Sequence, residues 1–504
     1  MMRIRYPTTL ALFLGVLWVK AIYPPASGIA DTDFYWHLTY GRWIVEHIAI
    51  PAGDIFSWTF YGQPYQLTQW LGEAAMGLAY NIAGQSGTKA LSVALAGITI
   101  GFAWLGARRY VDSLTALWLA ILCNLVQVVT PMRPQLFTFA ALSVSTYLLV
   151  SFAQTRRLRY LFCFPFLMCA WVNLHGGFIV GLGLLGLFAL GRTVESAKAK
   201  LLAKDAHDLA ALWLTLAASL LASLVNPYGF GAIAVVVMIG GLRSASVISE
   251  WMPVNLMTEL GWFYLLNLTP YIALMTVSGS RPRLTHGLLA GAFLTFGVMA
   301  NRQVAMCAAV MAPMTAALLA QTPHYARMRG RIVNASRPVL YGMASVLMLG
   351  AAPFIIGKGD ANWAATMNLQ YPLKATDFLE RHHLTRRVLS DTLEASYLIY
   401  RGIPVFVDGR MDLYRDRFYF EWYLASRAAP GWDALIRKHR PEVMLLRLDM
   451  AIRQVALATG QWKQVYQDER YSVLVAQESD LPSVPIKDVI YLDADGRAVR
   501  PYMP

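Results

Sequence analysis

Two aspartates, Asp31 and Asp33, lie two residues apart directly after the first long apolar segment of the chain. One carboxylate of such a pair can act as a general base while the other orients it. The pair can also hold a divalent cation such as Mg²⁺ or Mn²⁺, because these ions prefer hard oxygen ligands. Either residue can instead cap a helix that follows. The position directly after an apolar segment favours the catalytic or metal-binding interpretation.

Three further residues have side chains that can act on a phosphate group. Arg133 and Arg302 lie at the ends of apolar segments, in connections that otherwise carry few basic residues. Arginine forms bidentate pairs with phosphate, although an arginine at the end of a span can also snorkel to lipid headgroups. His175 can carry a proton or stabilise a departing phosphate, but a single histidine beside two glycines is also a common packed, hydrogen-bonded group. We predict a donor phosphate-binding role for all three.

A second set of residues is suited to a sugar or an acceptor. Glu250 can accept hydrogen bonds from hydroxyl groups, and the indole face of Trp251 can cover the C–H surface of a sugar. Glu250 can equally cap a surface helix. We place Trp36, His37 and Asn173 in the same predicted acceptor- or sugar-binding set.

The segment 407–412 offers another pair of charges, because Asp408 and Arg410 follow a predicted strand. They can form a binding site at the strand end. An Asp-Gly turn closed by a salt bridge explains them as well, and we favour this structural interpretation.

The elements that must position these residues are membrane spans. Of the 504 residues, 57% are hydrophobic and only 14% are charged, which is too apolar for a soluble enzyme. A spanning helix needs about 20 apolar residues to cross roughly 30 Å of hydrocarbon. We predict about eleven spans, near residues 7–24, 88–107, 113–130, 134–154, 159–174, 176–193, 208–226, 260–279, 284–300, 303–321 and 338–357. A twelfth apolar stretch, 229–241, suits a re-entrant or interfacial helix.

The distribution of basic residues predicts the topology. A net charge of +13 would suit a nucleic-acid-binding protein, but the basic residues lie in short tracts between apolar segments. Lysine and arginine resist translocation, so these tracts are expected in the cytoplasm. They comprise Arg3, Arg5, Arg108, Arg109, Arg156, Arg157, Arg159, Arg192, Lys198, Lys200, Lys204, Arg281, Arg283, Arg327, Arg329, Arg331 and Arg337. We therefore predict a multi-pass protein of the bacterial inner membrane with a cytoplasmic N-terminus, a periplasmic C-terminal domain and no nucleic-acid partner.

The domain organisation follows from where the apolar segments stop. We predict a transmembrane domain over 1–357, with a structured first outer loop at 24–87, and a soluble α/β domain over 358–504. The outer loop is expected to contain a surface helix near 34–47 and a second helix near 69–83 that leads into the next span. In the α/β domain we predict strands at 387–390, 404–407 and 443–446, a hairpin formed by 462–466 and 471–476, and helices at 375–380 and 432–438.

The first outer loop resembles a known group of proteins. The run from Asp31 to Leu38, followed by Gly41-Arg42, Pro51, Asp54 and Phe56-Ser57, resembles the first outer loop of a broad group of bacterial membrane proteins that is similar to GT-C glycosyltransferases. The stretches 171–176, 226–229, 250–251 and 407–410 look like the same group. The resemblance therefore covers nearly the whole chain, and the aromatic-His-Leu run after the two aspartates is its most specific part.

The resemblance implies a multispan GT-C fold and a polyprenyl-phosphate sugar as donor, with a glycan, lipid or protein as acceptor. It implies an essential acidic residue in the first outer loop, which corresponds here to Asp31 or Asp33. Transfer would invert the anomeric carbon: the carboxylate deprotonates an acceptor hydroxyl while the lipid phosphate departs and Arg302 or Arg133 neutralises it.

Two other classes of function fit part of the sequence. A transporter of lipid-linked glycans would need polar residues through the depth of the bundle, and the predicted mid-span positions are almost wholly apolar. A non-enzymatic assembly component for surface-glycan export would make the outer α/β domain indispensable and the two aspartates dispensable. The leading hypothesis is the glycosyltransferase.

Overall fold

The structure is a computed structural model that describes residues 6–22, 31, 33–327, 371–486, 491–492 and 498–499. The predicted span at 338–357 and the predicted domain boundary at 357/358 lie outside these described residues. The chain divides into two units. The helical unit comprises Met1–Pro24, Tyr40–Ile50 and Gln66–Lys358; the α/β unit comprises Pro25–Thr39, Pro51–Tyr65 and Gly359–Pro504.

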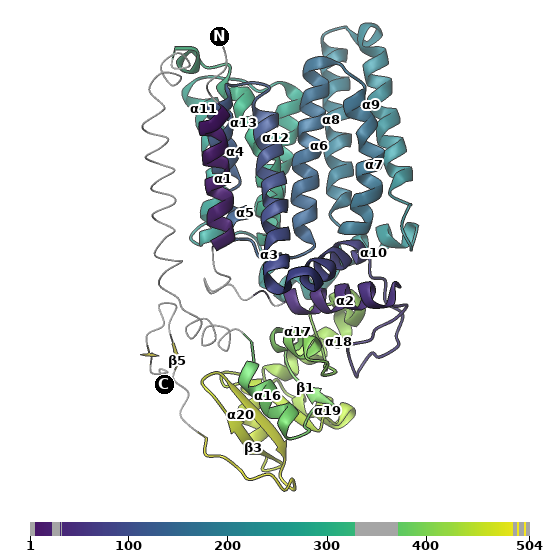
Figure 1. Cartoon of the computed structure of the whole chain (residues 1–504), viewed down its shortest axis with the longest axis vertical. Helices are drawn as coiled ribbons and strands as arrows, with labels where there is room; N and C mark the ends of the chain where they lie inside the picture. The colour runs from purple at the N-terminus through teal and green to yellow at the C-terminus, as the bar shows by residue number, and fades with distance from the viewer. Residues whose placement is uncertain are drawn as a thin grey trace. The chain divides into compact units, whose positions relative to one another are not determined.

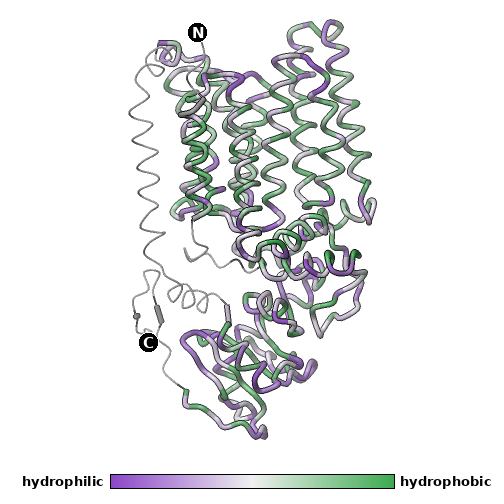
Figure 2. The backbone as a smooth tube through the Cα atoms, viewed as in Figure 1, coloured by the Kyte–Doolittle hydropathy of each residue, from purple (hydrophilic) through white to green (hydrophobic). Residues whose placement is uncertain are grey.

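Long helices run side by side in the helical unit (Figure 1). The described helices of this unit are α1 (Tyr6–Ile22), α3 (Trp70–Ala107), α4 (Ser113–Cys123), α5 (Val126–Val129), α6 (Gln135–Thr155), α7 (Arg159–Leu174), α8 (Phe178–Lys198), α9 (Leu202–Ala222), α10 (Phe230–Gly240), α11 (Glu259–Val277), α12 (Leu284–Met299) and α13 (Val304–Leu319), with 3₁₀ turns η1 (Arg243–Val247), η2 (Ser249–Trp251) and η3 (Asn301–Gln303). Their residues are mainly apolar along the length of the bundle (Figure 2).

These helices make the chain a polytopic α-helical membrane protein. Five described segments are long and apolar enough to cross a membrane: α3, α6, α8, α11 and the continuous segment of η3 and α13. Five more apolar helices are shorter, among them α10. The prediction of a short helix at 229–241 is confirmed, and the total of about eleven spans stays a prediction.

Helices α6 and α13 form the centre of the helical unit. In the most apolar part of α6 78% of the residues are buried, and in that of the continuous segment of η3 and α13 the share is 83%. Small residues allow such close packing between membrane helices. A Cβ atom built at Gly106 on α3, for example, would lie 2.8 Å from Cγ of Pro313 on α13.

Glycines also fix the crossing of α2 (Phe34–His47) on α3. A Cβ atom at Gly41 would lie 1.9 Å from the carbonyl oxygen of Glu73, and one at Gly77 would lie 2.2 Å from the carbonyl carbon of Gly41. The two backbones therefore touch, and no larger residue fits at either position without a shift of the backbone. Non-helical backbone at Ala83 and Gly84 divides α3 in two, which confirms the predicted helix at 69–83 before the span.

The α/β unit is built on a small mixed sheet. Its strands are β1 (Val388–Leu389), β2 (Val443–Arg447), β3 (Trp462–Gln467) and β4 (Tyr471–Ala476), in the order β1-β2-β4-β3. β1 is parallel to β2, and the other pairs are antiparallel. The helices are α16 (Leu373–Arg381), α17 (Thr392–Tyr400), α18 (Met411–Ser426), α19 (Trp432–His439) and α20 (Ala451–Ala458), and a separate pair is formed by β5 (Tyr491–Leu492) and β6 (Ala498–Val499).

Most predicted elements of this unit are confirmed: the β3–β4 hairpin, the strand β2, and the helices α16 and α19. The predicted strand at 404–407 is wrong. Residues 405–407 of this segment are buried, but within 404–407 only Val405 makes β-bridges, one to Ser57 and one to Val388.

Hydrogen bonds to the segment 51–65 hold Val405 in an extended conformation. Val405 N–H donates to the carbonyl of Phe56, and Trp58 N–H donates to the carbonyl of Val405, both at 3.0 Å. The indole N–H of Trp58 donates to the carbonyl of Val388 at 3.0 Å. Part of the first predicted outer loop thus pairs with a segment nearly 350 residues away in the sequence, and both belong to the α/β unit.

Candidate functional site

The two aspartates of the first outer loop have different surroundings in the α/β unit. Asp31 is buried, and its Oδ1 accepts a hydrogen bond from the backbone N–H of Asp33 at 3.0 Å. Asp33 is partly exposed and directly precedes α2. Its Oδ1 accepts from the indole N–H of Trp36 at 3.0 Å. Asp31 therefore shapes the turn, while Asp33 presents a carboxylate whose direction Trp36 helps to set.

Residues of the C-terminal segment hold this turn at three points. The hydroxyl of Tyr371 donates to the backbone carbonyl of Asp31 at 2.9 Å. Ser396 on α17 is buried, and its Oγ accepts from the backbone N–H of Trp36 at 3.0 Å. Gly409 lies so close that a Cβ atom built on it would be 2.5 Å from Oδ1 of Asp33.

The contact with Ser396 concerns the alternative interpretation, in which Asp31 or Asp33 caps the start of α2. Trp36 is the third residue of α2, and its N–H is one of the donors that a helix start leaves without an intrahelical partner. A residue distant in sequence supplies the acceptor for this N–H, so an oxygen of Ser396 occupies a position usually taken by the side chain of the capping residue.

Trp36 and His37 contact each other, with ring centroids 3.6 Å apart, and both are buried. Trp36 therefore contributes to the site through its bond to Asp33. The sugar- or acceptor-binding role of these two residues stays a prediction.

A buried ionic cluster lies next to Gly409 in the sequence. Arg410 Nη1 donates to Oδ1 of Asp54 and Arg410 Nη2 donates to Oδ2 of Asp408, both at 2.5 Å, and all three side chains are fully buried. The predicted salt bridge between Asp408 and Arg410 is thus present. The hydroxyl of Tyr414 donates a further bond to Asp408 at 2.9 Å. We call Asp54, Asp408 and Arg410 the buried ionic cluster.

The cluster also orders the segment 51–65. The carboxylate of Asp54 accepts from the backbone N–H of Phe56 at 3.1 Å and from that of Ser57 at 2.9 Å. The rings of Phe56 and Tyr65 lie 5.5 and 5.3 Å from the guanidinium carbon of Arg410. Hydrogen bonds and cation–π contacts of this kind compensate for burying the charges.

Asp412 follows the turn of Asp408, Gly409 and Arg410 and carries a further carboxyl group. Burial raises the pKa of Asp412 to about 6, although the Arg410 guanidinium opposes the shift. Burial also raises the pKa of Tyr414 well above its usual value, and the charge of Asp408 adds to this effect. Tyr414 therefore stays protonated and keeps donating its hydrogen bond to Asp408.

A second group of predicted site residues meets in the helical unit. Arg133 Nη1 lies 2.7 Å from Oε1 of Glu250, and the guanidinium carbon of Arg302 lies 4.5 Å from the ring centroid of Trp251. Arg133 is nearly buried, whereas the side chain of Glu250 is 38% exposed. We call Arg133, Glu250, Trp251 and Arg302 the arginine cluster.

Backbone contacts join the turns that carry the cluster. Asn301 N–H donates to the carbonyl of Met252 at 2.9 Å, and the Asn301 side chain donates to the carbonyl of Ser249 at 2.7 Å. The turns η2 and η3 are therefore fixed to each other. Within the cluster Arg133 pairs with Glu250 and Arg302 stacks on Trp251, and guanidinium groups are suited to bind an anion such as phosphate.

The geometry at His175 favours a neutral imidazole. Its Nδ1 accepts from the backbone N–H of Gly177 at 3.0 Å and lies 2.9 Å from the hydroxyl of Thr138. That hydroxyl accepts from the indole N–H of Trp171 at 2.9 Å, so its own proton points to His175. A ring nitrogen that accepts these bonds carries no proton. The phosphate-binding role of His175 stays a prediction, and any hydrogen bond to phosphate would come from Nε2.

Asn173 connects three segments of the helical unit. Its side-chain oxygen accepts from the indole N–H of Trp70 at 2.8 Å, and its nitrogen donates to the carbonyls of Cys169 and Val225 at 2.8 and 2.9 Å. These bonds fix the start of α3 to the end of α7. The predicted sugar- or acceptor-binding role of Asn173 is untested.

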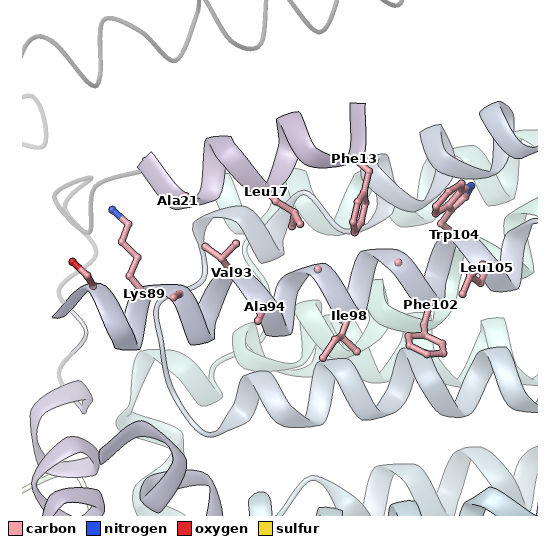
Figure 3. Close-up of a pocket in the computed structure, with 14 residues that line it drawn as sticks. Phe13, Leu17, Ala21, Lys89, Val93, Ala94, Ile98, Phe102, Trp104 and Leu105 are labelled. Atoms are coloured by element: carbon pink, nitrogen blue, oxygen red, sulfur yellow. The ribbon is translucent and has the colours of Figure 1, made fainter. Parts of the chain in front are cut away.

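An apolar groove of about 770 Å³ runs between α1 and α3 (Figure 3). Phe13 and Leu17 line it from α1, and Ile98 and Phe102 line it from α3. Among the described residues that line the groove, Lys89 is the one with a charge, and Figure 3 places it at the opposite end from Trp104. A groove of this shape and polarity can take a hydrocarbon chain.

A divalent cation at Asp31 and Asp33 would find few protein ligands. No third histidine, cysteine or carboxylate joins them to form a metal-binding group among the residues that the structure describes. Because Mg²⁺ usually keeps several waters and is bound by one or two carboxylates together with substrate phosphates, this donor set is compatible with Mg²⁺. Metal binding stays a prediction.

The sequence indicated the two aspartates of the first outer loop and the arginines Arg133 and Arg302. It did not indicate the buried ion pair of Asp54, or the contacts of Ser396 and Gly409. Asp54 was recognisable only as part of the resemblance. Ser396 lies in a short, mainly apolar stretch that carries no motif. Gly409 stands in an Asp-Gly-Arg turn, whose type gives no signal for a contact with Asp33 far away in the sequence.

Comparison with known proteins identifies the fold. No protein-family model and no curated protein matches the chain. The crystal structure of ArnT from Cupriavidus metallidurans bound to undecaprenyl phosphate is 16% identical, with a TM-score of 0.54 and coverage of 95% of this chain and 98% of ArnT. The oligosaccharyltransferase AglB from Archaeoglobus fulgidus, in complex with an inhibitory peptide and a dolichol-phosphate, is 11% identical, with a TM-score of 0.53 and coverage of 95% of this chain and 75% of AglB. Both have the GT-C fold, and this chain has it too.

Substitution of Asp54 by alanine is expected to destabilise the protein by ~3–5 kcal/mol, because it leaves the buried Arg410 with an incomplete set of partners. Thermal unfolding of the purified protein in detergent checks this. Asp433→Ala is the matched control: the ion pair of Asp433 with Arg437 is exposed, and its loss should cost ~0–1 kcal/mol. Equal losses in the two variants would contradict a structural role for the cluster.

Proposed function

We propose that this protein is a glycosyltransferase of the bacterial inner membrane. It moves a sugar from a polyprenyl-phosphate donor to a glycan, lipid or protein acceptor on the periplasmic face. The observation that carries the proposal is Asp33, a partly exposed carboxylate held by Trp36 in the first loop after the first span. The GT-C fold supports it, since ArnT and AglB with the same fold were solved with undecaprenyl phosphate and dolichol-phosphate.

In the proposed reaction Asp33 acts as the general base. Its carboxylate takes the proton of an acceptor hydroxyl as the hydroxyl oxygen attacks the anomeric carbon of the sugar. The bond between that carbon and the phosphate oxygen breaks, and the electron pair leaves with the phosphate. Attack from the side opposite the leaving group inverts the anomeric carbon, and the products are the glycosylated acceptor and the polyprenyl phosphate.

We assign the base to Asp33 and not to Asp31 for two reasons. Asp31 is 6% exposed, and an acceptor cannot approach a group so deeply buried without displacing its surroundings. Its Oδ1 also accepts the backbone N–H of Asp33. Asp31 therefore acts as a residue that positions Asp33.

The arginine cluster is proposed to bind the donor phosphate. The guanidinium groups of the cluster complement the phosphate, whose negative charge grows as the sugar departs. Both arginines are candidates for this contact, and the carboxylate of Glu250 orients Arg133 at 2.7 Å. The face of Trp251 positions the Arg302 guanidinium without reducing its charge.

The groove between α1 and α3 is proposed to take the isoprenoid chain of the donor. Its lining is apolar, as a hydrocarbon chain requires, and Lys89 at one end offers a cation to an anionic headgroup.

The alternative is a non-enzymatic assembly or transport component for surface-glycan export. It shares the membrane location and the α/β unit with the transferase, but it gives the Asp33 carboxylate no chemical task. Substitution of Asp33 therefore separates the two.

Asp33→Asn is expected to lower glycan transfer by roughly 10²–10⁴-fold, the usual contribution of a general base. Asp31→Asn is the matched control, because an asparagine oxygen can still accept the Asp33 N–H, and its loss should stay within about tenfold. The measurement is the surface-glycan and glycolipid profile of a deletion strain complemented with native, Asp31→Asn or Asp33→Asn protein at equal membrane levels. A native profile from the Asp33→Asn strain would favour the assembly or transport component.

Filling the groove should impair donor binding. Gly101→Leu would project a branched side chain towards Phe13, whereas a Cβ atom alone lies 3.7 Å from the Phe13 ring and fits. We expect Gly101→Leu to lose most of the polyprenyl phosphate that copurifies with the protein, quantified by mass spectrometry of the extracted lipids. Gly101→Ala should retain it. Equal lipid content in both variants would exclude this groove as the site of the isoprenoid chain.

A further inference from the structure

Gly409 contacts the carboxylate that the proposed function makes catalytic. A Cβ atom at this position would lie 2.5 Å from Oδ1 of Asp33, 3.4 Å from its Cγ and 3.5 Å from the indole nitrogen of Trp36. The nearest atoms therefore belong to side chains, and the closest is the end of the Asp33 side chain. An added methyl group would be accommodated most easily by rotating the carboxylate away.

The same atom of Asp33 accepts the Trp36 indole N–H at 3.0 Å. Oδ1 thus lies between a hydrogen-bond donor on one side and the backbone of Gly409 on another. Both restrict the rotation of the carboxylate about its Cα–Cβ and Cβ–Cγ bonds. The backbone of Trp36 is in turn fixed by its bond to the buried Ser396.

The turn that carries Gly409 is itself held rigidly. Arg410 donates its backbone N–H to Oδ1 of Asp408 at 2.9 Å, and its side chain completes the buried ionic cluster with Asp54. A shift of the Gly409 backbone would disturb fully buried charges, and breaking a buried ion pair is strongly destabilising. The Asp33 carboxylate therefore moves more easily than the Gly409 backbone when the two are brought into closer contact.

We propose that Gly409 is a positioning residue for Asp33, and that the C-terminal α/β segment thereby forms part of the transfer site. The proposal rests on the proposed function of Asp33 as general base. It assigns the C-terminal segment a role in the reaction itself: without a side chain at position 409, the Asp33 carboxylate keeps the one direction that Trp36 and the turn allow.

Two measurements on Gly409→Ala test the proposal. The first is the thermal unfolding temperature of the purified full-length protein, compared in the native and the Asp33→Ala backgrounds. Because Asp33→Ala removes the atom that the new methyl group would meet, Gly409→Ala should lower the unfolding temperature in the native background and have little effect in the Asp33→Ala background. The second is the surface-glycan profile of the complemented deletion strain, where Gly409→Ala should reduce the product by at least tenfold at equal protein level.

Each outcome has a distinct meaning. Equal unfolding shifts in both backgrounds would overturn the proposal, because the glycine would then serve its own turn and not Asp33. A full native glycan profile with Gly409→Ala would overturn it as well. If Asp33→Asn alone leaves the profile intact, the proposed function fails, but the unfolding comparison still shows whether Gly409 and Asp33 are coupled.

Discussion

The structure of the candidate site depends on the burial of one guanidinium group. Arg410 has no exposed side-chain surface, and a buried cation is tolerated only where carboxylates and hydrogen bonds compensate for its lost hydration. Asp408 supplies one partner from the adjacent turn, and Asp54 supplies the other from a segment more than 350 residues earlier in the chain. Because Arg410 needs both carboxylates, the segment that carries Asp54 and the turn that carries Asp408 have to lie together in one arrangement. This couples the predicted first outer loop to the C-terminal part of the α/β unit.

The position of Asp33 follows from that arrangement. The turn held by Arg410 presents Gly409 to the Asp33 carboxylate, while Ser396 fixes the start of α2 and Trp36 donates to Asp33. The proposed base therefore takes its direction from contacts made by residues at both ends of the chain. In the helical unit, glycine-to-glycine packing of α2 on α3 plays a comparable role, because backbone contact at Gly41 and Gly77 permits a single register.

Much of the fold could be predicted from the sequence because its causes are local. Apolar length indicated the membrane helices, and the short stretch that became α10 was recognisable as too short to span. Two strand-like segments joined by Asp468-Glu469 indicated the β3–β4 hairpin. The pairing of Glu250 with Arg133 and of Trp251 with Arg302 could not be predicted, since it depends on how separate turns meet. The segment at 404–407 was mistaken for a strand because burial produces an apolar run whether or not a full ladder forms. The role of Gly409 had no local signal at all.

The central claim is that the Asp33 carboxylate, held in this way, releases a polyprenyl phosphate from its sugar. The most direct measurement is made on proteoliposomes that contain the purified protein and the lipid extract of the deletion strain, where unused donor accumulates, together with a membrane extract as the source of acceptor. Mass spectrometry then follows the ratio of sugar-linked polyprenyl phosphate to free polyprenyl phosphate over time. The account predicts that native protein converts the linked form to the free form and that Asp33→Asn protein leaves it unchanged. Conversion at the same rate by both proteins, or by neither, would contradict it.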